Sequence, residues 1–139
     1  MQNTYHIHPI GWVHKSENSM TIDIDPLYAD ALLGLETFSH ITVLYWFHEH
    51  DNPENRSILQ VHPRKNPKNP LTGVFATHAP VRPNLIAVTT CKIKSIDNTT
   101  IRIDDIDARD GSPVVDIKCY VPEKKAIADL KLPEWVARD

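Results

Sequence analysis

The feature that most restricts the fold of this sequence is a repeated alternation of apolar and polar residues over short stretches. Residues 21–24, 86–96 and 100–106 alternate in this way, which is the period of a strand with one buried face. The intervening Asp97-Asn98-Thr99 has the composition of a hairpin turn. Residues 38–47 are nearly continuously apolar, which predicts a central strand covered on both faces. Shorter strands are expected at residues 5–8, 74–77 and 114–120.

Two segments depart from this alternation. Residues 25–34 predict a helix, because Asp25 can cap the first amides, Pro26 suits the first helical position and Gly34 can end it. Residues 51–72 contain four prolines and little periodicity, which is typical of a long functional or mobile loop. The predicted fold is mostly β: a small single-domain β-barrel of about seven or eight short strands, with one short helix (25–34) and a long Pro-rich loop (51–72).

Length and charge limit the possible functions. A chain of 139 residues corresponds to one domain, predicted over 1–139 with a motif-bearing core at about 4–122 and a polar tail at 123–139. A net charge of -3 is unlike the strongly basic face of a free-standing nucleic-acid binder, although a local basic stretch can exist within it. We find neither a signal-peptide pattern nor an apolar run long enough for a membrane span, so we expect a cytoplasmic protein.

The four glycines are dispersed, so the sequence contains no Gly-rich phosphate-binding loop, and any nucleotide must be bound in another way. One candidate site is the basic patch His62, Arg64, Lys65 and Lys68, which is either a phosphate-contacting edge or a solvated loop. A second is Arg82 and Asn84, in a segment that prolines stiffen. Its side chains either present forked donors and an amide to a ligand, or belong to a structural crossover in which Arg82 pairs a carboxylate.

The aspartates of residues 104–111 form the third candidate. Closely spaced carboxylates can accept hydrogen bonds from ribose hydroxyls or an adenine amine, and their spacing does not match an EF-hand loop. The histidine pairs His6/His8 and His48/His50 would each share a strand face, which with Glu49 could form a zinc or iron site. No further ligand triad is evident, so we predict no metal. Cys91 and Cys119 have no metal-type spacing, and we expect both to be buried free thiols.

The order of these motifs resembles the TsaA-like (TrmO-type) family over roughly residues 8–122. The resemblance is carried by Gly34-Leu35-Glu36-Thr37-Phe38-Ser39-His40-Ile41, Phe47-His48-Glu49, His62-Pro63-Arg64, Gly73-Val74-Phe75-Ala76-Thr77, Arg82-Pro83-Asn84 with Ile86, and the run from Asp107 through Asp110-Gly111-Ser112-Pro113-Val114-Val115-Asp116-Ile117-Lys118 to Tyr120.

This resemblance implies a small β-barrel homodimer that uses S-adenosyl-L-methionine as cofactor, in a methyltransferase architecture unrelated to Rossmann enzymes. The implied reaction is methylation of the exocyclic nitrogen of threonylcarbamoyladenosine beside the tRNA anticodon. Carried over by position, the cofactor contacts fall on His48, Glu49, His78, Asp107, Ala108, Arg109, Asp110 and Gly111. Arg82 and Asn84 lie in the family's most recognisable motif, and we expect them to be the catalytic residues. If tRNA is the substrate, we expect it to bind at His62, Arg64, Lys65 and Lys68, the only dense basic stretch near the expected site.

The sequence departs from the family pattern at three places. His78-Ala79-Pro80 stands where the family usually has Arg-Ser-Pro, and Leu85 and Ala87 stand where it has Pro and Gly. The family's Pro-Arg-Gln cofactor segment has no counterpart between Val13 and Met20. We therefore expect a short, divergent member without the accessory C-terminal domain. Two alternatives stay open: a methyltransferase of a small molecule, and a non-enzymatic descendant that binds a ligand or a metal through histidines.

Overall fold

The computed structural model describes residues 3–137, so residues 1, 2, 138 and 139 of the predicted domain lie outside the described residues. The contacts divide the chain into two compact units, which are described separately. The barrel unit contains the residues up to Glu49 and Ile86–Tyr120. The second unit contains His50–Leu85 and the residues from Val121 onward. The single-domain organisation stays a prediction.

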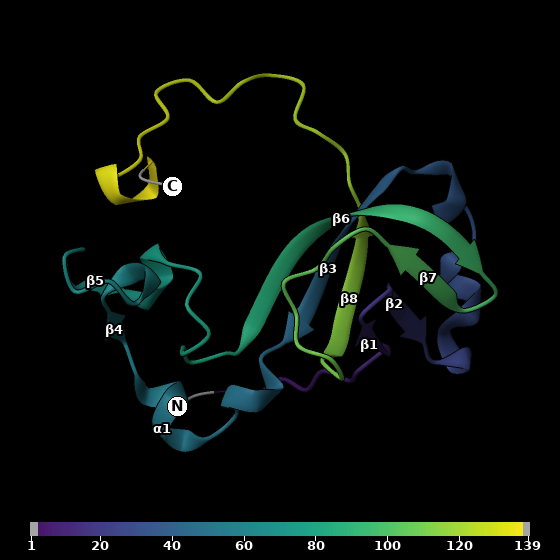
Figure 1. Cartoon of the computed structure of the whole chain (residues 1–139), viewed down its shortest axis with the longest axis horizontal. Helices are drawn as coiled ribbons and strands as arrows, with labels where there is room; N and C mark the ends of the chain where they lie inside the picture. The colour runs from purple at the N-terminus through teal and green to yellow at the C-terminus, as the bar shows by residue number, and fades with distance from the viewer. Residues whose placement is uncertain (1–2, 138–139) are drawn as a thin grey trace. The chain divides into compact units, whose positions relative to one another are not determined.

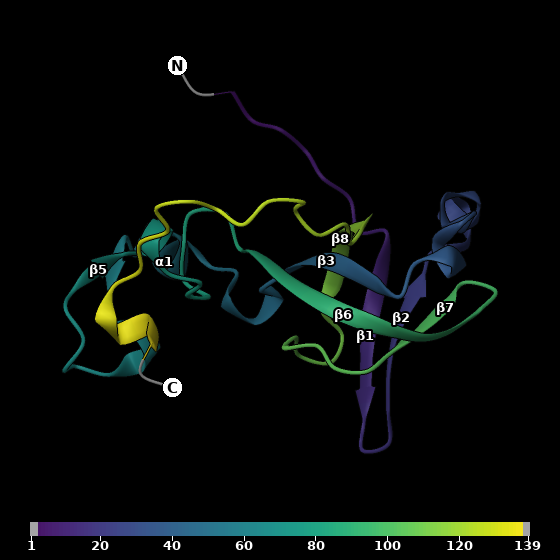
Figure 2. The ribbon, with the colours of Figure 1, turned by 90° about the horizontal axis from the view of Figure 1, so that it is seen from above.

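The barrel unit is a closed sheet of six antiparallel strands in the order β1-β2-β7-β6-β3-β8 (Figure 1). Figure 2 shows β6 turning tightly into β7, as the Asp-Asn-Thr turn predicted. This architecture confirms the mostly β, barrel prediction. The strands are β1 (Gly11–Ser16), β2 (Ser19–Ile24), β3 (His40–Trp46), β6 (Ile86–Asp97), β7 (Thr100–Ile103) and β8 (Pro113–Cys119).

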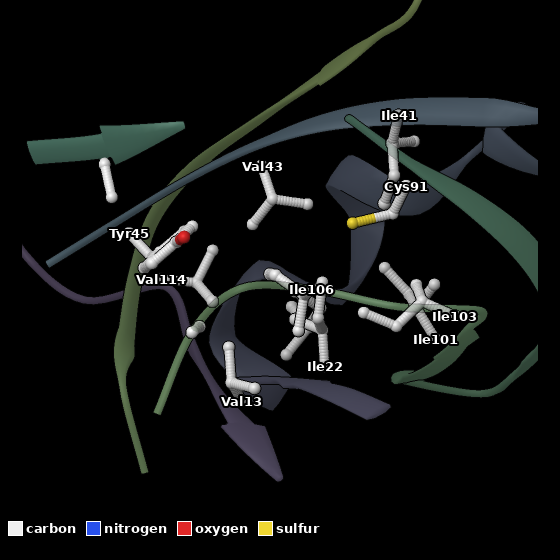
Figure 3. Packing of buried hydrophobic residues seen from close by; sticks show 13 residues of the cluster. Val13, Ile22, Ile41, Val43, Tyr45, Cys91, Ile101, Ile103, Ile106 and Val114 are labelled. Carbon is white, nitrogen blue, oxygen red and sulfur yellow. The ribbon is translucent and has the colours of Figure 1, made fainter. Parts of the chain in front are cut away.

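Branched aliphatic side chains fill the barrel, because every second residue of each strand points inward (Figure 3). Val13, Ile22, Ile41, Ile101 and Val114 are each fully buried. Gly11 lies in β1 where the chain passes close to β2, and a Cβ there would collide with the carbonyl oxygen of Asp23. A larger residue at Gly11 would therefore push the first two strands apart.

Three predicted elements of the barrel unit are corrected. Residues 5–8 are not a strand, and β3 alternates between buried and half-buried positions because the barrel covers only its inner face. Residues 25–34 contain a 3-10 helix, η1 (Pro26–Leu32), rather than an α-helix of that length; Asp25 caps it as expected, by accepting from Leu27 N at 3.0 Å. Gly34 then adopts a left-handed conformation before η2 (Leu35–Thr37).

The second unit consists of short elements joined by hydrogen-bonded turns. It contains α1 (Pro53–Ser57), a two-stranded sheet of β4 (Gln60–Val61) and β5 (Thr72–Gly73), and the 3-10 turns η4 (Pro63–Lys65), η5 (Val74–Ala76) and η6 (Glu134–Ala137). The predicted loop 51–72 is therefore partly ordered into elements, and the predicted strand 74–77 is a 3-10 turn. Both views place η6 beside the β4–β5 segment (Figures 1 and 2).

The prediction that each of the two histidine pairs shares one face of a strand is wrong. His6 and His8 lie outside any strand, and His48–His50 form the 3-10 turn η3 after β3 has ended at Trp46. In residues 3–137, no three His, Cys, Asp or Glu side chains gather in a metal-binding arrangement. No helix in the same range is long and apolar enough to cross a membrane.

Candidate functional site

The barrel unit holds all the predicted cofactor residues except His78, on the turn between β7 and β8 and just after the end of β3. The phenol of Tyr45, a core residue of β3, donates to the carbonyl oxygen of Asp107 at 2.9 Å and lies 3.0 Å from Thr89 Oγ1. Burial raises the pKa of Tyr45, and the nearby Asp107 carboxylate raises it further. The phenol therefore remains a protonated donor, which fixes the start of the turn to the barrel core.

The rest of this turn is attached to β1. Asp110 Oδ1 accepts from the backbone N–H of Lys15 at 2.8 Å, and Lys15 Nζ donates to the carbonyl of Ile106 at 2.7 Å. Gly111 has a φ of 82°, which favours glycine, and its N–H donates to Val13 O at 2.7 Å. The turn is thus held at both ends, while the side chains of Asp107 and Asp110 are exposed.

Glu49 and Arg109 bring the two predicted segments together. Their side chains form an ion pair, with Arg109 Nε 3.5 Å from Glu49 Oε2. Because both side chains are more than half exposed, the pair adds little stability and can exchange partners when a ligand arrives. The structure therefore joins the end of β3 to the 107–111 turn.

His48 contributes a buried polar atom without a partner. Its Nδ1 atom is buried and has no hydrogen-bond partner among the described residues. A buried polar nitrogen that is left unpaired is costly, so such an atom often marks a place where a ligand or water binds. The set formed by His48, Glu49, Asp107 and Asp110 offers carboxylate acceptors and one unsatisfied imidazole nitrogen, which suits a ribose and an amine-bearing ligand.

The remaining predicted residues lie in the second unit. Arg82 Nη1 donates to the carbonyls of Thr77 at 3.2 Å and Ala79 at 3.1 Å, so it braces the segment that carries His78. These partners are carbonyls, not the carboxylate that the alternative reading of Arg82 assumed. Asn84 is exposed. The catalytic roles of Arg82 and Asn84 stay predictions, and so does a cofactor site that joins His78 to the barrel residues.

The predicted RNA-binding residues divide into two groups. His62, Arg64 and Lys65 line a cavity of about 800 Å³ within the second unit, together with His78. Lys68 is on the same loop but does not line this cavity. Sequence reasoning missed two residues of these sites: Tyr45, which resembled an ordinary core residue, and Trp135, which lines the same cavity from the tail.

Other predicted features have structural roles. Leu85 and Ala87, two of the departures from the family pattern, are buried at 0% and 6% exposure, so both are packing positions. Cys91 is buried as expected, but Cys119 is exposed at the end of β8. Burial, with the carboxylates of Asp104 and Asp105, raises the pKa of the Cys91 thiol to about 12, so it remains a neutral thiol.

Comparison with known proteins gives a consistent result. The family model of the tRNA-methyltransferase O N-terminal domain matches residues 4–126. A probable S-adenosyl-L-methionine-binding protein from Pyrococcus horikoshii is 47% identical over 120 residues, 86% of this chain and 85% of that protein. The human tRNA (adenine(37)-N6)-methyltransferase is 40% identical over 93 residues, which cover 67% of this chain and 20% of the human protein.

A crystal structure of TrmO from Pseudomonas aeruginosa superimposes with a TM-score of 0.69 at 29% identity. The match covers 93% of this chain but 62% of the crystallised one, so the chain spans about three fifths of that protein. The family model covers most of the sequence, and the six-stranded barrel is similar in architecture. The resemblance recognised in the sequence is therefore confirmed, and the chain belongs to the tRNA-methyltransferase O N-terminal domain family.

Proposed function

We propose that this chain is an S-adenosyl-L-methionine-dependent methyltransferase that modifies N6 of the adenosine at position 37 of tRNA. The observation that carries the proposal is the barrel-unit cluster, in which Glu49 pairs with Arg109 of the anchored 107–111 turn. The residue before Glu49, His48, has a buried Nδ1 without a hydrogen-bond partner among the described residues. The names of the archaeal and human relatives support both the cofactor and the acceptor. We further propose threonylcarbamoyladenosine as the form of the acceptor that is methylated.

The barrel residues fit S-adenosyl-L-methionine by their donor and acceptor types. The exposed carboxylates of Asp107 and Asp110 can accept from the ribose hydroxyls, and the carboxylate of Glu49 can accept from a charged or polar amine. Arg109, freed from Glu49, can bind a carboxylate through its forked donors. A polar group of the cofactor can also pair with His48 Nδ1, which has no hydrogen-bond partner among the described residues.

The bound cofactor supplies an electrophilic methyl group on a sulfonium. Methyl transfer would form the N6–carbon bond and break the sulfur–carbon bond, and the N6 proton would pass to water. The residues of this chain therefore need to position two molecules rather than to supply a nucleophile. Arg82 contributes as a brace of the segment that carries His78.

The test combines calorimetry with a methyl-transfer assay on tRNA. Glu49→Gln and Asp107→Asn each remove a carboxylate, so the affinity for S-adenosyl-L-methionine should fall about tenfold, as for a lost charged hydrogen bond of roughly 1.5 kcal/mol. Asp97→Asn, at the far end of β6, is the matched control. If wild-type protein gives no binding heat at millimolar cofactor, the methyltransferase proposal is wrong.

A small-molecule acceptor is the second candidate, and the net charge of -3 favours it over a polyanionic substrate. Two tRNA substrates, with and without the threonylcarbamoyl group, separate the possibilities. Transfer to the modified tRNA alone supports the finer proposal, and transfer to unmodified tRNA limits it to adenosine 37. Cofactor binding without transfer to either tRNA leaves the small-molecule acceptor.

We also propose a cytoplasmic homodimer. Because the barrel is closed, it has no open sheet edge that a second chain would need to cover. The remaining argument is the number of exposed large apolar side chains, such as Leu33 at 93% and Leu27 at 78%. Light scattering at tens of micromolar should give twice the chain mass, and a monomer mass would contradict the proposal.

A further inference from the structure

The cavity of the second unit is built from three stretches of chain. Its walls come from the basic loop (residues 62–65), the segment 75–81 and the tail (residues 132–136), together with His50 and Val61. Its volume, about 800 Å³, is within the range of small-molecule and nucleotide sites. The tail is therefore a wall of this cavity.

The charge of the lining selects the ligand. Arg64 and Lys65 are cationic, whereas no Asp or Glu occurs among the described residues that line the cavity. A phosphate would be attracted by this lining. A sulfonium cation would be repelled, so the cavity suits a phosphate-bearing ligand better than it suits S-adenosyl-L-methionine.

Aromatic side chains are the second recognition element. Trp135 lines the cavity, and so does Phe75, which is 84% exposed despite being strongly apolar. Exposed aromatic rings beside cations are the combination that binds unstacked bases, because every base has a face on which an aromatic ring can stack.

The basic loop is held rigidly. Asn69 is buried, and its side-chain Nδ2 donates to the backbone oxygen of Pro63 at 2.8 Å. The backbone carbonyl oxygen of Asn69 lies 2.8 Å from His62 Nδ1. Arg64 and Lys65 both have positive φ angles, 60° and 56°, which non-glycine residues adopt only at a cost.

The other two walls are also fixed. Arg64 Nη2 donates to Val136 O at 3.3 Å, which ties the tail to the basic loop. Thr77 Oγ1 donates to Val74 O at 2.9 Å, and Arg82 braces the same segment through the carbonyls of Thr77 and Ala79. The cationic and aromatic groups are therefore positioned before a ligand binds, which lowers the entropy cost of binding.

We propose that this cavity receives an unstacked nucleotide of the RNA substrate, with Phe75 and Trp135 contacting the base and Lys65 the phosphate. This inference rests on the proposed function, since it assigns the tail a part in binding the tRNA acceptor. The shared chemistry is that of a nucleoside monophosphate, which could also arrive as a free nucleotide. Lys68, outside the cavity lining, has no role in it.

The test measures binding of an anticodon stem-loop RNA and of S-adenosyl-L-methionine to the full chain. Phe75→Leu and Trp135→Leu should each weaken RNA binding about five- to 150-fold, the range for loss of one stacked base, and leave cofactor affinity unchanged. Trp135→Phe should restore most of the affinity. Tyr5→Leu is the matched control, because Tyr5 is 85% exposed and does not line the cavity.

Charge is tested separately. Lys65→Ala should reduce the slope of log affinity against log salt by about one, because one phosphate contact is lost. Lys124→Ala, an exposed tail residue outside the cavity lining, should leave the slope unchanged.

A fluorescence titration keeps the inference testable if a cavity variant fails to fold. Replacing Trp12 and Trp46 by Phe leaves Trp135 as the sole tryptophan. Adenosine monophosphate should quench it at lower concentration than adenosine does. No quenching by the monophosphate or by the stem-loop RNA would overturn the inference.

The outcomes also separate this inference from the proposed function. Wild-type RNA affinity in Phe75→Leu and Trp135→Leu, with methylation of tRNA intact, overturns the inference alone. A loss of cofactor affinity in these variants would assign the cavity to S-adenosyl-L-methionine and would also overturn the inference. If the free nucleotide quenches the fluorescence but no RNA binds, the cavity is a nucleotide site, and the inference that the nucleotide belongs to tRNA is overturned.

Discussion

The two units of this chain are ordered by different interactions. The barrel unit has a continuous core of aliphatic residues, including Ile22, Ile41 and Ile101, each at 0% exposure. The second unit buries few large apolar side chains and leaves Leu59, Leu71 and Phe75 more than half exposed. Its loops are held by side-chain to backbone hydrogen bonds instead. Burial stabilises the barrel, whereas a polar network positions the cationic side chains of the second unit.

The largest expected effect tests whether the barrel interior excludes water. The pKa of Cys91 is raised from 9.0 to about 12, so at pH 8 its thiolate is about a thousandfold scarcer than that of an ordinary thiol. A thiol reagent should therefore modify Cys119 rapidly and Cys91 only after denaturation. Rapid reaction of two thiols in the native protein would show that the interior is open.

The same shift has a consequence for stability. The folded state keeps the Cys91 proton at pH values where the unfolded chain loses it. This contribution to stability is complete below about pH 9 and decreases as the pH rises toward 12. A Cys91→Ala variant should show a weaker alkaline dependence between these values, as measured by urea unfolding, and the part that remains includes Tyr45, whose pKa is also raised.

The second prediction compares burial in the two units. Ile101→Ala should lower the free energy of unfolding by about 2–5 kcal/mol, because it leaves a cavity in the barrel core. Leu71→Ala, at a position 59% exposed in the second unit, should change it by about 0.5 kcal/mol or less. Urea denaturation measures both. Equal losses would mean that Leu71 is covered in solution, and the contrast between the units would fail.

The smallest expected effect concerns the polar network. Asn69→Ala removes the donor to the buried carbonyl oxygen of Pro63. The unpaired oxygen should lower the local stability of the loop by about 1–3 kcal/mol. We expect faster proteolysis within residues 62–70, with little change in exchange protection of β3 and β6. Lys68→Ala, at an exposed position of the same loop, is the control. Loss of barrel protection in Asn69→Ala would show that the two units unfold together.

The sequence predicted the barrel where the physical signal was local. Residues 86–96 and 100–106 alternate with period two, and they form a hairpin much as expected. β1 was missed because its inward positions are Gly11 and Val13, which leave almost no apolar alternation. Residues 5–8 do alternate but pair with no neighbouring strand, and a short strand without pairing is not stable.

The sequence could indicate which residues lie near one another in the barrel unit, while their functional roles stay predictions. Motif order named Glu49, Arg109 and Asp107, which the structure joins in one cluster. The brace formed by Arg82 could not be inferred, because its partners are backbone carbonyls that carry no residue signature. The place of Trp135 depends on contacts across some seventy residues of chain, such as Arg64 with Val136, and no local pattern reports these.

The left-handed conformations of Arg64 and Lys65 bear on how this protein can evolve. Glycine would relieve the strain at either position, by about 1 kcal/mol each, and would be favoured by selection for stability alone. It would also delete a cation from the loop. Drift toward glycine at these two positions would therefore be expected in a lineage that no longer needs the charge, and their retention as Arg and Lys would mark a lineage that still does.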